Sequence, residues 1–173
     1  MKSARIWQLV AILLVTAFPA FAQIQDVQIT ASKKKLDEDK SREGTNKTVI
    51  TKEIAYNITL QNKRFKVMPE VQVKYMIFVS DEKGGSTDGA ATNAHTGSET
   101  LKDIASNATV SFETKSFKLT TVDLDAGWYY TTGAGNRARD KANGIWIRAY
   151  ADGKIIGEYA NPSTISKKND WKE

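Results

Sequence analysis

The sequence of 173 residues contains no cysteine and a single histidine, His95. Without cysteine the chain forms no disulfide and offers no thiolate as a nucleophile or metal ligand. A lone histidine leaves a histidine-based catalytic triad, or a histidine-rich zinc site, without visible partners. Small eukaryotic secreted domains usually carry disulfides. The composition therefore favours a bacterial chain that folds on its hydrophobic core alone.

The sequence also has only one long apolar run, and this run lies at the N-terminus. Lys2 and Arg5 precede the run from Ile6 to Val15, and the small-x-small pattern Ala20-Phe21-Ala22 follows it. This order is the three-part layout of a secretory signal peptide. The run is about half of the ~20 residues that a membrane span needs. We therefore expect a cleaved signal peptide and no transmembrane span in the mature chain; an uncleaved N-terminal anchor is the alternative.

Cleavage is expected between Ala22 and Gln23, which divides the chain into a signal peptide (1–22), one domain (23–166) and a charged C-terminal tail (167–173). Removing the two basic residues of the leader leaves 23 basic and 20 acidic residues, a net charge of +3 instead of +5. Charges of mixed sign do not make the concentrated basic face that nucleic-acid binding requires. We expect an exported protein, in the periplasm, associated with the outer membrane or extracellular, without a nucleic-acid partner.

Apolar residues that alternate at period two predict β-strands through most of the mature chain. The clearest strands are expected over residues 48–61 and 70–80. In the second of these the alternation fades toward the end, which predicts that this half is covered on both faces. The charged stretch 32–47 and the Gly-, Ser- and Thr-rich stretch 81–99 are expected to be exposed loops.

The C-terminal part of the domain predicts a β-hairpin around Asp152-Gly153, the strongest short-range hairpin signal. A two-residue turn would pair Trp146 with Tyr159, and which face of the hairpin belongs to the core stays open. A bulge or bend is expected near residues 114–116, where the strand pattern changes phase. Roughly six to eight short strands with turns between them and no convincing helix predict an all-β, antiparallel sandwich.

Three segments together resemble immunoglobulin-like or fibronectin-like sandwiches exported by Gram-negative bacteria. They are the strand Tyr56–Asn62, the strand Pro69–Val79, and the hairpin Trp146–Lys154 with Ala160-Asn161-Pro162. The resemblance implies a single immunoglobulin-like domain, without the cysteine pair of antibody domains. Such domains recur in cell-surface, adhesion and type IV pilus-associated proteins, which implies a binding or assembly role with an envelope or surface protein as partner. The resemblance carries over no functional residue and implies no cofactor.

The residues that could carry chemistry are few and scattered. His95 is expected in an exposed loop. The acidic residues Asp81, Glu82, Asp123 and Asp125 could serve a glycosidase, and with Asp88 they could ligate calcium, but adjacent carboxylates on loops are ordinarily solvated surface. We expect no catalytic residue, no metal site and no enzymatic activity.

An aromatic cluster is the remaining candidate site. Trp128, Tyr129 and Tyr130 are adjacent, so in a strand over 128–131 they would point to both faces. The favoured interpretation places Trp128 and Tyr130 in the core and Tyr129 on the surface. The alternative is that exposed aromatic rings bind a glycan or anchor a protein interface. These three residues are therefore the candidate binding residues.

Overall fold

The computed structural model describes residues 26–82, 91–132 and 135–171, and the expected signal peptide with its Ala22–Gln23 cleavage site lies outside these ranges. The described residues form strands and one four-residue helix. In chain order these elements are β1 (Val27–Glu43), β2 (Lys47–Asn62), β3 (Met68–Asp81), β4 (Ala91–Ile104), β5 (Thr109–Glu113), β6 (Phe117–Leu124), β7 (Arg137–Arg139), β8 (Lys141–Ala151), β9 (Lys154–Asn161) and α1 (Ile165–Lys168).

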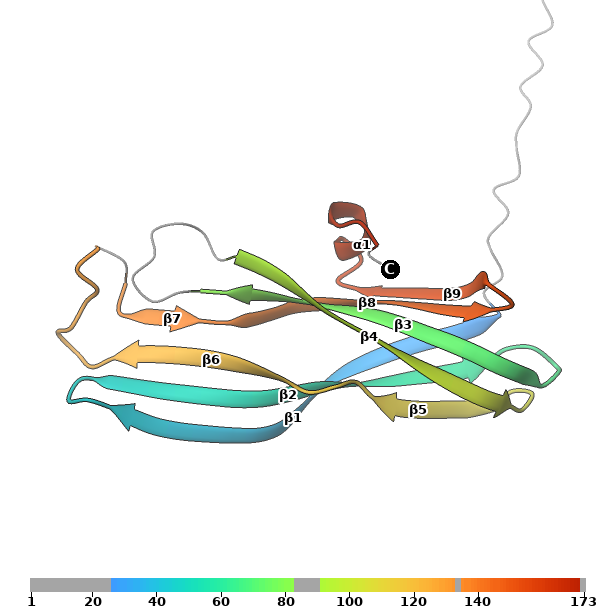
Figure 1. Cartoon of the computed structure of the whole chain (residues 1–173), viewed down its shortest axis with the longest axis horizontal. Coiled ribbons are helices and arrows are strands. Elements are labelled where there is room, and N and C mark those ends of the chain that lie inside the picture. The colour runs from blue at the N-terminus through green and yellow to red at the C-terminus, as the bar shows by residue number, and fades with distance from the viewer. Residues whose placement is uncertain (1–25, 83–90, 133–134, 172–173) are drawn as a thin grey trace, which may run out of the picture.

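The strands form two antiparallel sheets that lie against each other along the long axis of the molecule (Figure 1). Sheet A has the order β1-β2-β6-β7, with β5 also paired to β2, and sheet B has the order β4-β3-β8-β9. Every recorded pair of strands is antiparallel. The expectation of an all-β chain with two antiparallel sheets is confirmed.

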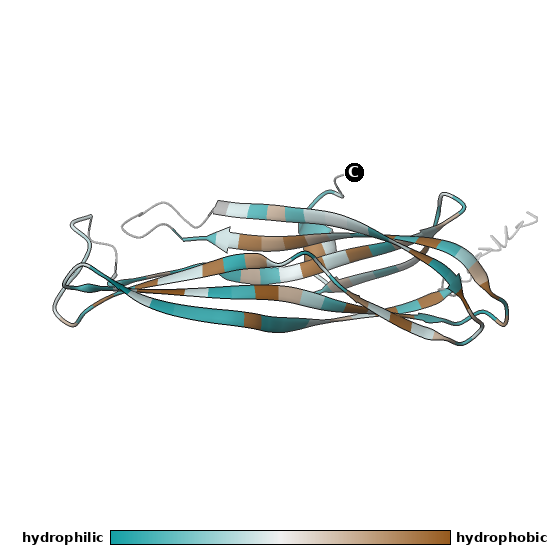
Figure 2. Cartoon of the chain, turned by 60° about the horizontal axis from the view of Figure 1, so that its bottom comes forward, coloured by the Kyte–Doolittle hydropathy of each residue, from teal (hydrophilic) through white to brown (hydrophobic). Residues whose placement is uncertain are grey.

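The core lies between the inner faces of the two sheets. Figure 2 shows hydrophobic and hydrophilic residues alternating along the strands. Both clearly predicted strands contribute: Ile58 and Leu60 of β2 and Val71, Val73 and Ile77 of β3 are almost fully buried. Alternation works here because successive side chains of a strand point to opposite faces.

The second half of β3 is covered on both faces, as the sequence predicts. Met76 and Phe78 point to the outer face of sheet B, where they form a second buried cluster with Trp146 and Ile165. Ile165 belongs to α1, and Trp171 packs against the same cluster from the C-terminal segment. Part of the stretch 167–173 therefore lies over sheet B.

The expected bend between the Phe112 and Phe117 strands is confirmed, because β5 ends at Glu113 and β6 begins at Phe117. Both strands pair with β2. Thr114 makes the connection: its side-chain Oγ1 accepts a hydrogen bond from the Tyr56 N–H at 2.9 Å, and its own N–H donates to the Tyr56 carbonyl at 2.9 Å.

Two of the expected loops are strands. The stretch 32–47 is mostly the end of β1, which pairs with β2 as far as Glu43 before the turn at Gly44. Its charged side chains stay in solvent, so charge did not prevent strand pairing. In the stretch 81–99, residues 83–90 lie outside the described residues and β4 begins at Ala91, so small polar side chains form an exposed edge strand there.

The hairpin around Asp152-Gly153 is confirmed as β8 and β9, but the predicted pairing of Trp146 with Tyr159 is wrong. A register shift between Ala149 and Tyr150 places Trp146 opposite Ala160 and Tyr159 opposite Ile147. An extra residue on one strand turns every later side chain to the other face. Here the extra residue is Ile156 of β9, so the alternation of β8 is unchanged: Trp146 faces the outer cluster and Ile147 faces the core between the sheets.

The chain passes from sheet A to sheet B at Asp140, between β7 and β8. The Asp140 carboxylate accepts hydrogen bonds from the backbone N–H of Thr120 at 2.8 Å and of Glu82 at 3.2 Å. This side chain joins the two layers at the crossing. No helix among the described residues is long and apolar enough to cross a membrane.

Candidate functional site

Large apolar side chains are exposed mainly at the two ends of the sandwich, where strands are connected. Trp128 and Tyr129 lie between β6 and β7 at one end, and Phe65 and Val67 lie between β2 and β3 at the other (Figure 1). Exposed aromatic side chains on supported loops are typical of binding surfaces.

The aromatic cluster nominated from the sequence lies on a turn instead of in a strand. Trp128 is 54% and Tyr129 69% exposed, whereas Tyr130 is half-buried, so the interpretation that Trp128 and Tyr130 fill the core is wrong. The physical reason is the positive φ of Gly127, +88°, together with the hydrogen bond from the Trp128 N–H to the Asp125 carbonyl at 3.0 Å. The chain turns before the aromatic residues, and they gain no cross-strand neighbours.

This aromatic turn is tied to the tip of the β1–β2 hairpin. The Asp125 N–H donates to the Asn46 carbonyl at 2.9 Å, and the Arg42 guanidinium pairs with the Asp125 carboxylate at 2.5 Å. Arg42 also donates to the Thr45 carbonyl at 2.7 Å. These contacts hold the turn against the tip of the β1–β2 hairpin and leave Trp128 and Tyr129 facing solvent.

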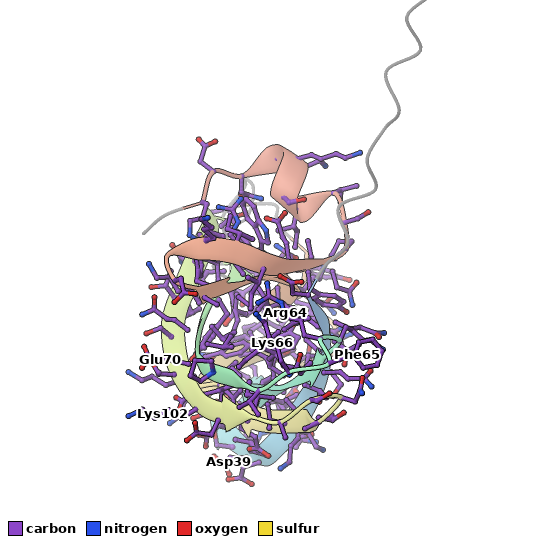
Figure 3. All side chains as sticks on the ribbon, turned by 90° about the vertical axis from the view of Figure 1, so that its right-hand side faces the viewer. Asp39, Arg64, Phe65, Lys66, Glu70 and Lys102 are labelled. Carbon is purple, nitrogen blue, oxygen red and sulfur yellow. The ribbon has the colours of Figure 1, made fainter. Side chains whose placement is uncertain are left out.

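The opposite end carries a loop over residues 63–67, which we call the Phe65 loop. Phe65 at its tip is 92% exposed. Figure 3 looks onto this end and shows Phe65 projecting at the margin of the molecule, with Arg64 and Lys66 on either side of it in the chain. The strand pattern of the sequence did not single out Phe65; the signal available was an aromatic residue flanked by basic ones in the run Lys63-Arg64-Phe65-Lys66.

The Phe65 loop is held by Asn62, the last residue of β2, which is fully buried. Its side-chain amide N–H groups donate to the carbonyls of Lys66, Ile104 and Ala105 at 2.9, 3.2 and 2.9 Å. Its side-chain oxygen accepts from the Arg64 N–H at 2.8 Å. One buried side chain thus fixes the start, the middle and the end of the loop, and joins it to the end of β4.

An ion pair between Arg64 and Asp26 anchors the loop to the start of β1. The hydrogen bond from the Arg64 guanidinium lowers the pKa of the Asp26 carboxyl, and that carboxylate in turn raises the pKa of Arg64. Each charge stabilises the ionised form of the other. Lys63 and Lys66 make no ion pair within the described residues, although the charge of Lys66 also helps to lower the pKa of Asp26, so the loop carries net positive charge beside Phe65.

A groove of about 660 Å³ borders the Phe65 loop. Arg64, Lys66 and Val67 form one side of it, and Tyr150 and the hairpin turn around Asp152 form the other. The ammonium of Lys74 lies 5.4 Å from the centre of the Tyr150 ring, on the same strip of sheet B. This groove has the size of a ligand pocket, and it gives this end of the sandwich a concave and a protruding part.

The other nominated residues do not converge. His95 lies on β4, not in a loop, and its ring stacks on Phe117 at 5.5 Å between centroids. Asp81 accepts a hydrogen bond from Asn93, and Asp123 pairs with Arg137 and raises its pKa. Asp88 lies outside the described residues.

The two remaining candidate carboxylates, those of Asp125 and Glu82, form contacts within the protein. Asp125 pairs with Arg42, and Glu82 accepts a hydrogen bond from the Arg139 N–H at 3.1 Å. Across residues 26–82, 91–132 and 135–171, no three His, Asp or Glu side chains gather as metal ligands would. The acidic side chains here stabilise strand connections.

No protein-family model and no curated protein matches this chain. Solved structures are only distantly similar, as two of them illustrate. The Northeast Structural Genomics Consortium target SoR45 is 11% identical, with 86% of this chain and 96% of that one covered and a TM-score of 0.37. A crystal structure from Akkermansia muciniphila is 12% identical, with 80% and 73% covered and a TM-score of 0.29. The fold class therefore rests on the strand pairing of this chain itself.

Proposed function

We propose that this chain is a non-enzymatic, exported, immunoglobulin-like module of the bacterial envelope that binds a protein partner through the Phe65 loop. The observation that carries the proposal is a phenylalanine 92% exposed on a loop whose backbone is fixed by a fully buried asparagine. An exposed aromatic ring adds little to folding, whereas a fixed one loses little entropy when it enters a pocket. Binding therefore explains both features.

The partner we propose has an apolar pocket with an acidic rim. The pocket would receive the Phe65 ring, and acidic side chains would face Lys63 and Lys66. A projection of the partner would fill the groove between Lys66 and Tyr150. Aromatic anchors surrounded by polar contacts are the usual centre of a protein interface. Proteins of cell-surface, adhesive and pilus-like assemblies are the proposed setting, in line with the resemblance of the strands and hairpin.

The test uses a photo-crosslinking amino acid in place of Phe65 in the native bacterium, with the same amino acid at Leu36 as the matched control. Leu36 is also exposed and apolar but lies on β1. A protein cross-linked at position 65 and not at 36 is purified, and its affinity is measured for the unaltered protein and for Phe65→Ala. We expect a loss of roughly 30-fold or more, as for an interface anchor.

The proposal fails if position 65 cross-links no more than position 36. It also fails if Phe65→Ala binds the purified partner as tightly as the unaltered protein does. Because Phe65 is almost fully exposed, its removal should leave the free energy of unfolding unchanged, so loss of binding cannot be ascribed to misfolding.

A second candidate function is glycan binding by the aromatic turn. Trp128 and Tyr129 are adjacent and both exposed, and aromatic rings stack on the faces of sugars. The test titrates purified envelope polysaccharide into the protein and follows tryptophan fluorescence. Binding that is lost in Trp128→Ala and kept in Phe65→Ala favours this candidate, and binding unchanged by Trp128→Ala excludes it.

A further inference from the structure

Most sheet edges in the described part of the chain are protected against pairing with another strand. The free edge of β1 carries charged side chains from Lys33 to Glu43 and a register shift after Lys35. On the other side of sheet A, β5 and β7 have only five and three residues. The edge of β9 is approached by the start of β1, where the Asp26 N–H donates to the Ile156 carbonyl at 3.1 Å. Charge, shortness and cover are the usual protections of an edge.

The edge strand β4 lacks these protections. It is 14 residues long, contains no proline and, among the residues that the structure describes, pairs with β3 alone, without a register shift. From Ala91 to Ser98 it carries no acidic or basic residue except His95. From Ala91 to Lys102, before the positive φ of Asp103, its outer edge therefore presents a regular row of backbone N–H and C=O groups that can accept another strand.

We propose that β4 pairs antiparallel with β4 of a second copy of this chain, with the two-fold axis at Gly97. A two-fold axis between identical antiparallel strands runs perpendicular to the sheet and passes midway between a residue and its own copy. Centred on Gly97, the pairing places Ala91 opposite Asp103, Glu99 opposite His95 and Thr96 opposite Ser98. No like charges face each other, and the Glu99 carboxylate can accept a hydrogen bond from the imidazole of the other copy.

Charge disfavours three of the registers that lie further along the strand, namely those centred on Glu99, Leu101 and Lys102. Centring on Glu99 places that carboxylate opposite itself, and centring on Leu101 places it opposite Asp103. Centring on Lys102 opposes two ammonium groups. Like charges directly opposite each other destabilise a pair of strands. The Gly97 register is the one that pairs almost the whole strand and gives Glu99 a polar counterpart.

Gly97 is also suited to lie at the axis, because the space on the inner side of β4 at this position is already filled. The Tyr75 ring lies where a side chain at position 97 would be, and its hydroxyl accepts a hydrogen bond from the Lys115 N–H at 3.2 Å. The β4 edge is therefore backed by an ordered ring at its centre. Joining two copies there makes one continuous sheet of four plus four strands.

The absence of cysteine makes the register directly testable. In the double variant Thr96→Cys/Ser98→Cys, each new thiol lies opposite one in the second copy, at the Cα separation that a disulfide needs. The control Thr92→Cys/Ala94→Cys has the same spacing on the same strand and face, but the Gly97 register places its thiols far apart. Under mild oxidation we expect roughly ten-fold more cross-linked dimer from the first variant than from the control.

Sedimentation of the exported protein provides the second measurement. At about 100 μM, where a complex of micromolar affinity is largely formed, we expect twice the monomer mass. Thr96→Lys/Ser98→Lys, which opposes lysines across the axis, should sediment as a monomer with an unchanged circular dichroism spectrum. A monomeric unaltered protein overturns the proposal, as does equal cross-linking of the two cysteine variants or a dimer that persists in the lysine variant. If β4 instead pairs with a strand of another protein, the purified protein is monomeric, and the proposed pairing of two copies is wrong.

Discussion

At the scale of single residues, Asn62 determines the geometry of the candidate binding end. It is the buried polar side chain with the most hydrogen-bond partners in the described structure: three carbonyls and one backbone N–H. A buried amide is tolerated only when its donors and acceptors are paired. Asn62 meets this condition because the loop on one side and the end of β4 on the other both turn their carbonyls toward it.

Replacing Asn62 with alanine should therefore lower the free energy of unfolding by about 3 kcal/mol, because it leaves several buried backbone groups unpaired. Urea unfolding followed by tryptophan fluorescence measures the change. Gln61→Ala is the control, since the neighbouring side chain lies on the opposite face of β2 and makes no such bonds. A loss no larger than that of the control would show that water replaces the amide.

Gly97 is a second residue with a specific requirement. A methyl group there would overlap the ring and hydroxyl of Tyr75. Gly97→Ala should destabilise the protein by about 2 kcal/mol, as overpacking does, and combining it with Tyr75→Leu should remove much of that cost. A double-mutant cycle in urea should give a coupling of about 1 kcal/mol or more. Additive effects would contradict the close approach of the ring to this glycine.

Single residues were the hardest feature to predict from the sequence. The aromatic cluster was nominated correctly as unusual, yet its expected burial was wrong for Trp128, because a turn at Gly127 removed the strand on which the expectation depended. Phe65 was not singled out. The loop that exposes it is held in part by bonds that Asn62 makes with Ile104 and Ala105, more than forty positions away, and no local pattern predicts such contacts.

At the scale of elements, period-two alternation was sufficient to predict the strands β2 and β3 and the β8–β9 hairpin, because one face of each strand is buried. It failed for the second half of β1 and for β4, because neither buries a regular face. Their side chains match those of loops, and they are strands only because β2 and β3 extend far enough to pair with them. The partner strand, not the local sequence, decides the conformation of such segments.

Ion pairs also connect the elements, and the Asp26–Arg64 pair predicts how stability depends on pH. The pair lowers the pKa of Asp26 below its ordinary value of 3.8. A carboxyl whose pKa is lower in the folded state stabilises the fold above its unfolded pKa and loses this effect as the pH falls through the folded value. We therefore expect this contribution to be constant from pH 7 to about pH 5 and to disappear in more acidic solution.

The measurement compares urea unfolding of the unaltered protein and Asp26→Asn at pH 7 and at pH 3. The difference in stability between the two proteins should shrink on acidification. Asp39→Asn is the control, because Asp39 makes no ion pair within the described residues. A difference that stays the same at both pH values would mean that the carboxylate charge of Asp26 does not stabilise the start of β1.

At the scale of the whole molecule, the sandwich separates three kinds of surface. The two ends present aromatic residues on supported turns, the β4 edge presents unpaired backbone, and the outer face of sheet B is covered by the chain's own C-terminal segment. The layers were predictable because alternating strands must bury one face. The covering of sheet B by the C-terminal segment was not predictable, because the last residues are mainly polar and their contribution to stability depends on one contact with a residue distant in the sequence.

That contact is made by Trp171, whose ring meets Trp146 edge-to-face at 5.0 Å. The Arg148 guanidinium lies 4.6 Å from each of the two rings and donates to Glu158 at 2.7 Å. A guanidinium held over aromatic faces adds a cation–π attraction to the apolar contact. The C-terminal segment is thereby fastened over Met76 and Phe78.

Trp171→Ala should release this segment and lower the free energy of unfolding by about 2 kcal/mol, less than for a fully buried tryptophan because Trp171 is half-buried. The same variant should bind a hydrophobic fluorescent dye, since Met76, Phe78 and Trp146 lose their cover. The matched control is Trp128→Ala, the same substitution at a tryptophan that is 54% exposed, for which we expect no change in either measurement. Equal effects of the two substitutions would mean that the C-terminal segment does not stabilise sheet B, and that its outer face is stable without cover.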